Sequence, residues 1–265
     1  MSIEENILPD NPAARLQSML VRMVDVEFDV NEQVSTVFAR VCQIDNEPEK
    51  IFPHYSQLFI LIQDAYEKVV QFYPNQQKTH LSWKNHLTKN LQSHSPYHHQ
   101  WKALMDKLQH AHYLDMVQIA SDNLAHYVKP TEVYGLTIEK LAEQVTSLIE
   151  EIKNSNDLSP YLKVFLSEEL SNILNCVRQF DLYGSEPIRK SIYNILANSE
   201  VSKKGKSKVV KNLCLFAVTV ATAIGVINDA VEFPKSLDSL RSEFLLPDLN
   251  GSEHTEIAED EKSEE

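Results

Sequence analysis

The chain has 265 residues and a formal charge of −13, from 38 acidic and 25 basic side chains. It is long enough to bury an apolar core without disulfides or structural metals. Only five glycines occur, which excludes the glycine-rich loops that bind phosphate groups and disfavours a fold built from β-hairpins.

Apolar residues recur at helical spacing in the first half of the chain. Asn11 followed by Pro12 predicts a capped helix start, and the apolar stripe from Leu16 to Val24 predicts that this helix has one buried face. Similar stripes predict a helix that begins after Asn31 and ends near Asp45 to Pro48, and another helix that begins after Pro53. A further stripe from Met116 to Tyr127 predicts a helix that ends before Pro130, with weaker helical patterns over 80–94 and 96–111.

The second half continues the helical pattern. Thr137 is expected to open one helix, and Ser159 with Pro160 is expected to start the next. That helix should end at Gly184, because glycine takes the left-handed conformation beyond a helix end at little cost. A short antiparallel helical hairpin is therefore predicted around Gly184.

We predict an all-α fold, a multi-helix bundle of about nine or ten helices, with two stacked helical subdomains as an alternative arrangement. The chain is predicted to begin with a flexible N-terminus (1–10), followed by an N-terminal helical bundle (11–130) and a helical hairpin region (131–200). The next region (201–247) is predicted to contain a basic linker, an apolar helix (213–227) and, after Pro234, a short amphipathic helix. A disordered acidic tail (248–265) follows.

The apolar helix at 213–227 has two interpretations. Residues 212–228 carry no charge, and five lysines precede them, which is the layout of a membrane span with a cytoplasmic basic flank. Ala217, Ala221 and Gly225 recur at every fourth position and would let another helix pack closely. Because 17 uncharged residues reach only ~25 Å against a hydrocarbon thickness of ~30 Å, a buried core helix is favoured over a membrane span.

The segment 68–105 contains no Asp or Glu, although the protein is acidic overall. Lysines, histidines and aromatic residues alternate in it, a mixture that suits binding of an anionic ligand or a nucleic acid. The lysines are sparse and no arginine accompanies them, so an ordinary solvated surface is the simpler interpretation. The candidate anion-binding residues are Lys78, His80, Lys84, His86, Lys89, His98, His99 and Trp101.

No residues are assigned to catalysis, to a metal or to a cofactor. The pairs Asp106 with His110 and Asp122 with His126 have helical i, i+4 spacing, but ordinary surface ion pairs account for them. Cys42, Cys176 and Cys214 stand far apart, which fits a reducing compartment. Acidic residues before any apolar stretch argue against a secretory signal, so we expect a cytoplasmic protein, with membrane association as the alternative.

The leading functional hypothesis is a non-enzymatic helical protein with an interaction or regulatory role. It would bind a partner protein or a second copy of itself. Residues 229–265, with 12 acidic and 3 basic side chains, could engage a basic partner. The alternative is a membrane-attached effector that uses helix 213–227. The third hypothesis is binding of an anionic ligand or nucleic acid through 68–105.

Overall fold

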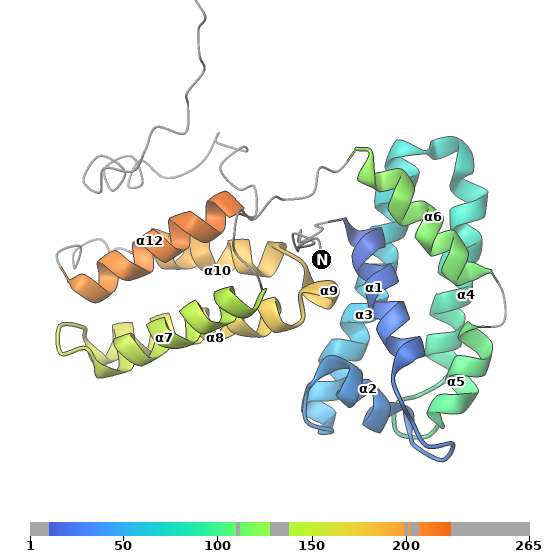
Figure 1. Cartoon of the computed structure of the whole chain (residues 1–265), viewed down its shortest axis with the longest axis horizontal. Helices are drawn as coiled ribbons and strands as arrows, with labels where there is room; N and C mark the ends of the chain where they lie inside the picture. Colours follow the sequence, from blue (N-terminus) through green and yellow to red (C-terminus); the bar gives the residue numbers. More distant parts are fainter. Residues whose placement is uncertain (1–10, 110–111, 128–137, 199–200, 202–206, 224–265) are drawn as a thin grey trace, which may run out of the picture. The chain divides into compact units, whose positions relative to one another are not determined.

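The computed structural model describes residues 11–109, 112–127, 138–198, 201 and 207–223 (Figure 1). Within these residues the elements are helices, without a β-strand, which confirms the predicted all-α fold. The described part has eleven α-helices and one 3-10 helix, η1. Their bounds are α1 (Pro12–Asp25), α2 (Val34–Cys42), α3 (Pro48–Phe72), η1 (Pro74–Gln76), α4 (Gln77–Ser93), α5 (Trp101–Leu108), α6 (Tyr113–Ala125), α7 (Ile138–Asn154), α8 (Pro160–Arg178), α9 (Phe180–Tyr183), α10 (Glu186–Ala197) and α12 (Lys208–Ala223).

The start of α1 follows the predicted capping pattern. The Asn11 side-chain oxygen accepts hydrogen bonds from the backbone N–H groups of Ala13 (3.0 Å) and Ala14 (3.2 Å), and Pro12 occupies the first helical position. The amide Nδ2 of Asn11 also donates to the Ser121 carbonyl at 3.1 Å. One buried side chain therefore caps α1 and ties it to α6.

The third helix begins earlier than predicted. It starts at Pro48, which lies at the first helical position, and continues through Pro53 rather than beginning after it. A proline lacks the N–H that would bond to the carbonyl one turn back, so it normally weakens a helix interior. Pro53 is exposed to solvent in the second turn, where water can bond to the freed carbonyl.

The end of α2 contains the one described non-glycine residue with a positive φ. Gln43 lies in the left-handed region (φ 54°, ψ 43°) and its N–H bonds back to the last turn of α2. Glycine adopts this conformation without the steric conflict that a Cβ creates. The fold thus uses a glutamine at a position that favours glycine.

Gln43→Gly should raise the free energy of unfolding by about 0.5–1 kcal/mol, because it removes this conflict. Urea denaturation monitored by circular dichroism would measure the change. As a control, Gln144→Gly, at an exposed position in the middle of α7, should lower stability by about 1 kcal/mol. A loss of stability in Gln43→Gly would mean that the glutamine side chain makes a compensating contact.

Buried side chains of α1 to α6 form one apolar core. α1 packs against α3 and α6, and α4 packs against α3, α5 and α6. Trp83 and Trp101 are the largest side chains in this core, and both are completely buried. Leu182 of α9 belongs to the same core, although it lies far along the chain.

The helices α7, α8, α10 and α12 pack on one another: α8 contacts α7 and α10, and α12 contacts the same two helices. The buried face of α7 includes Leu141, Val145, Leu148 and Ile152. The helix that begins at Pro160 ends at Arg178, however, and not at Gly184 as predicted. The backbone bends at Gln179, and the one-turn helix α9 follows.

α9 is held by polar contacts as well as by Leu182. The Asp181 carboxylate accepts hydrogen bonds from Ser18 Oγ (2.9 Å) and from Arg22 Nη1 (3.1 Å), both on α1. Gly184 ends α9 with φ 67° and ψ −162°; its φ is positive, but its ψ differs from that of the predicted left-handed conformation. This φ/ψ combination is accessible to glycine and strained for other residues.

The predicted apolar helix 213–227 corresponds to α12, which begins at Lys208 and is described as far as Ala223. Leu213, Phe216 and Ala217 are buried, and α12 contacts α7 and α10. Ala221 lies in the same helix, whereas Gly225 lies outside the described residues. Among the described residues, no helix has the length and apolar character needed to cross a membrane.

Four further predictions concern residues that the structure does not describe. The N-terminus (1–10), the boundary at 130/131, the short amphipathic helix after Pro234 and the acidic tail (248–265) all lie outside the described residues.

Candidate interaction surface on α4

The acid-free segment 68–105 covers the end of α3, all of α4, the loop 94–100 and the start of α5. The eight candidate residues do not form one site. Lys78, Lys84, His86 and Lys89 lie at least partly exposed on α4, and His98 and His99 are exposed in the loop, whereas His80 and Trp101 are buried.

His80 and Trp83 form a buried polar pair inside the core. Trp83 Nε1–H donates to His80 Nδ1 at 3.1 Å, and His80 Nε2 lies 3.3 Å from the side-chain oxygen of Gln76. Since Nδ1 accepts, the neutral imidazole carries its proton on Nε2. Burial lowers the pKa of His80, because a charged imidazole loses hydration there. His80 therefore supports the core and does not present itself to an anion.

The lowered pKa predicts how stability depends on pH. A histidine that stays neutral in the fold contributes fully above its ordinary pKa of about 6.5, and this contribution is lost as pH falls from there through the lowered pKa. The free energy of unfolding, measured by urea denaturation at pH 7 and pH 5, should fall less in His80→Gln than in the parent protein. Leu81→Gln on the same helix is the control and should keep the parent's dependence. An equal fall in His80→Gln would exclude this role for His80.

Trp101 is also unavailable to a ligand. Its side chain is completely buried, and its backbone N–H donates to the Glu32 carbonyl at 2.9 Å. Two further backbone bonds, from Val34 N to His99 O (2.9 Å) and from Ser35 N to Pro96 O (2.8 Å), attach the loop 94–100 to the start of α2. His98 and His99 thus belong to a loop fixed on α2, and the ring of His99 contacts that of His94 at the end of α4, with centroids 5.4 Å apart.

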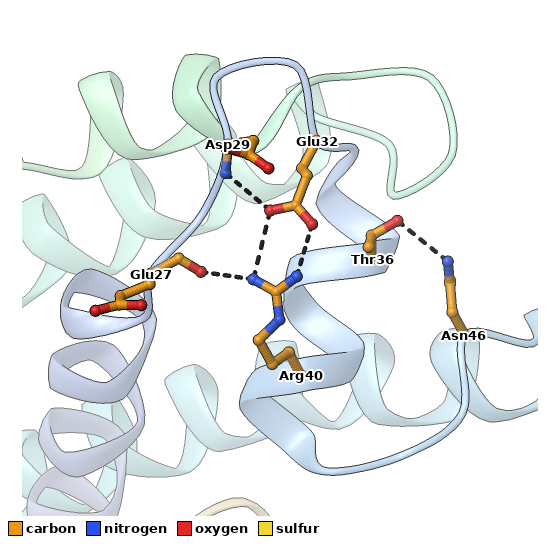
Figure 2. Close-up of polar contacts among 6 residues, drawn as sticks. All are labelled: Glu27, Asp29, Glu32, Thr36, Arg40 and Asn46. Atoms are coloured by element: carbon orange, nitrogen blue, oxygen red, sulfur yellow. Dashed lines mark hydrogen bonds and ion pairs between the residues drawn. The ribbon is translucent and has the colours of Figure 1, made fainter.

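Figure 2 shows the polar contacts that hold the segment before α2. The Arg40 guanidinium contacts both oxygens of the Glu32 carboxylate (2.6 and 3.4 Å) and also donates to the Glu27 carbonyl. The Glu32 carboxylate accepts a further bond from the backbone N–H of Asp29 at 2.9 Å. The hydrogen bond from Arg40, followed by that from Asp29, lowers the pKa of Glu32. The arrangement is an exposed structural clamp rather than a ligand site.

His86 is engaged within the fold. Its ring stacks on that of Tyr113, with centroids 3.9 Å apart, and its Nε2 lies 3.1 Å from the Lys107 carbonyl. The imidazole therefore links α4 to Lys107 of α5 and to Tyr113 of α6. Of the candidates on α4, Lys78 and Lys89 are exposed on its outer side, and half-buried Lys84 lies on the flank toward α3.

The outer side of α4 carries Lys78 and Lys89, whereas Lys84 lies on the flank of α4 that faces Tyr66 of α3. The buried side of α4 is defined by His80, Trp83, Leu87 and Leu91, so residues on the opposite side point to solvent. We name the outer and flanking set the α4 basic face; it consists of Lys78, Leu81, Ser82, Lys84, Asn85 and Lys89.

Charge on this face is not compensated by neighbouring acids. α4 contains no carboxylate, and in the part of the chain that the structure describes Lys78, Lys84 and Lys89 take part in no ion pair. By contrast, Lys102 pairs with Asp106 at 2.8 Å and Lys50 pairs with Asp45. The ammonium of Lys84 lies 5.0 Å from the ring centroid of Tyr66 on α3, which restricts its position.

The described residues contain no cluster of three or more His, Cys, Asp or Glu side chains that could hold a metal ion. Asp122 of the predicted Asp–His pairs accepts a hydrogen bond from Gln118 at 2.8 Å, and His110 lies outside the described residues. Burial raises the pKa of Cys42 to about 12 and that of Cys176 and Cys214 to about 11. All three thiols are free and protonated at neutral pH.

No family model, no curated protein and no solved structure matches this chain. The physical character of the α4 basic face is therefore the basis for assigning a function.

Proposed function

We propose that this chain is a non-enzymatic protein-interaction protein and that a partner protein binds to the α4 basic face. The observation that supports this is the unpaired positive charge on α4, which has three lysines and no carboxylate in a protein of net charge −13. Charged surfaces of this kind accelerate association and select partners of opposite charge.

The side chains of the face also suit a protein contact. Leu81 is 37% exposed and provides an apolar patch between the lysines, while Ser82 and Asn85 offer hydrogen-bonding groups. Lys84 is already restricted by Tyr66, so binding costs it less conformational entropy than it would cost a free lysine. We place this interaction in the cytoplasm, since three free cysteines suit a reducing compartment.

Site-specific photo-crosslinking tests this proposal. A photoreactive amino acid replaces Asn85 at the centre of the face, and a matched protein carries it at Asn172, which is exposed on α8. Irradiation in cells should give defined crosslinked adducts from position 85 that position 172 does not give. The masses of the adducts would distinguish a second copy of the chain from a different protein.

Either kind of adduct from position 85 would support an interaction at this face. No adduct, or the same adducts from positions 85 and 172, would contradict it. Circular dichroism of both substituted proteins would verify that they fold.

A further inference from the structure

We propose that His94 and His99 form a binding site for a zinc ion beside the C-terminal end of α4. His94 directly follows α4, which ends at Ser93, and His99 belongs to the loop 94–100. This inference goes beyond the function proposed above and does not depend on it.

The distance between the two imidazole rings suits a shared metal ion. Their centroids lie 5.4 Å apart, with an angle of 65° between the ring planes. Zinc binds imidazole nitrogen at ~2.0–2.1 Å in a tetrahedral arrangement, which places the centroids of two ligand rings ~5.2 Å apart. Each ring can turn about its own zinc–nitrogen bond, so the angle between the planes is compatible with binding. His99 is exposed and its ring is able to adjust without a change in the backbone.

The hydrogen bond of His94 leaves one ring nitrogen for a metal. Its Nδ1 lies 2.7 Å from the Asn90 carbonyl, and a carbonyl can only accept, so Nδ1 carries the proton. The lone pair of the neutral imidazole is then on Nε2. Histidines that bind metals commonly donate their other N–H to a backbone carbonyl in this way, which fixes the tautomer and the orientation of the ring.

The backbone at both histidines is held in place by hydrogen bonds. The His94 carbonyl accepts from the hydroxyl of buried Tyr55 at 3.0 Å. The His99 carbonyl accepts from the Val34 N–H at 2.9 Å, and the His99 N–H donates to the Ser95 carbonyl at 3.3 Å. Since the two positions are already fixed, little conformational entropy is lost when the rings bind an ion.

The chemistry of the segment selects the kind of ion. Imidazole nitrogen suits zinc and related transition metals, whereas Mg²⁺ and Ca²⁺ prefer oxygen ligands such as carboxylates. Residues 68–105 contain no Asp or Glu, so this segment offers nitrogen ligands without carboxylates. Two protein ligands leave two positions of a tetrahedral ion for water, so binding should be weaker than at zinc sites with three or four protein ligands.

Other histidines of the segment are engaged elsewhere. His80 is buried and its Nδ1 accepts from Trp83, and the ring of His86 stacks on Tyr113. Among the histidines that the structure describes, His94 and His99 are the two whose rings contact each other.

A zinc titration of the untagged, reduced chain at neutral pH tests the inference. Competition with a chromogenic zinc chelator measures the affinity, and magnesium chloride serves as the control salt. Nitrogen-15 NMR of the imidazole rings locates the ion in the unaltered protein. The ring signals of His94 and His99 should shift as zinc is added, whereas magnesium should leave them unchanged.

Variants identify the ligands independently. His94→Gln and His99→Gln should each weaken zinc binding about tenfold or more, because even the loss of an outer partner of a metal-binding histidine costs ~10–100-fold in affinity. The matched control is His98→Gln, which removes an exposed imidazole from the same loop and should bind zinc like the parent chain. Circular dichroism would verify that all three variants fold.

Each outcome decides the matter. Shifted ring signals at both histidines, with loss of affinity in both variants but not in His98→Gln, support the site. Absent zinc binding, unshifted signals, loss in only one of the two variants, or an equal loss in His98→Gln overturns it. Magnesium that displaces zinc would also overturn it, because a pair of imidazoles does not hold a hard cation.

Discussion

Gly184→Ala should lower the free energy of unfolding by about 2–4 kcal/mol. Part of this loss comes from the backbone, because φ 67° with ψ −162° is a conformation that residues with a Cβ avoid. The rest comes from a steric conflict, since an added Cβ would lie 2.6 Å from both Cζ and Nη1 of Arg15 on α1. Urea denaturation of the parent and the variant would measure the difference.

A double-mutant cycle separates these two causes. Gly184→Ala should cost less in an Arg15→Ala background than in the parent, because the steric conflict is removed while the backbone strain stays. An equal cost in both backgrounds would assign the whole effect to the backbone. If Gly184→Ala left stability within ~0.5 kcal/mol of the parent, the tight approach of Gly184 to Arg15 would be wrong.

Trp83→Ala should lower the free energy of unfolding by about 3–5 kcal/mol, the range expected when a large buried aromatic side chain is removed. The variant also loses the hydrogen bond from Trp83 Nε1 to His80 Nδ1 and leaves that acceptor buried without its donor. Thermal and urea denaturation would measure the loss. A ligand-stacking tryptophan on the surface would give a much smaller change.

The matched control is Leu81→Ala on the same helix. Leu81 is 37% exposed, so its truncation should change stability much less than truncation of Trp83. Equal effects at the two positions would contradict the orientation of α4 on which the α4 basic face depends.

The helical elements could be predicted because their signals are local. The capping side chain of Asn11 and the position of Pro12 act within one turn, and both are present as predicted. The sequence pattern predicts a start after Pro53 rather than at Pro48, because proline is common in the first turn of a helix, although an exposed proline later in the helix can also be accommodated. The division of α8 from α9 at Gln179 depends on Leu182 packing into a distant core, which no local pattern records.

Composition alone selects candidate residues without regard to their burial. The absence of acid in 68–105 points to Lys78, Lys84 and Lys89, which lie at least partly exposed on α4, but equally to His80 and Trp101, which are buried. One signal for burial was available in α4: His80, Trp83, Leu87 and Leu91 follow helical spacing and share one side. Only two of these four residues, Leu87 and Leu91, are aliphatic, so the apolar stripe of α4 is hard to recognise in the sequence.

Because Cys42 and Cys214 are buried in separate helices, the protein carries two built-in reporters of local opening, and half-buried Cys176 provides a comparison. Cys42 lies in α2, Cys176 in α8 and Cys214 in α12, and their raised pKa values leave very little reactive thiolate at neutral pH. Alkylating reagents should therefore modify Cys42 and Cys214 at a pace set by how often each helix detaches, and Cys176 faster than either. Peptide mass analysis of a timed labelling series would read these two local stabilities from one unmodified sample.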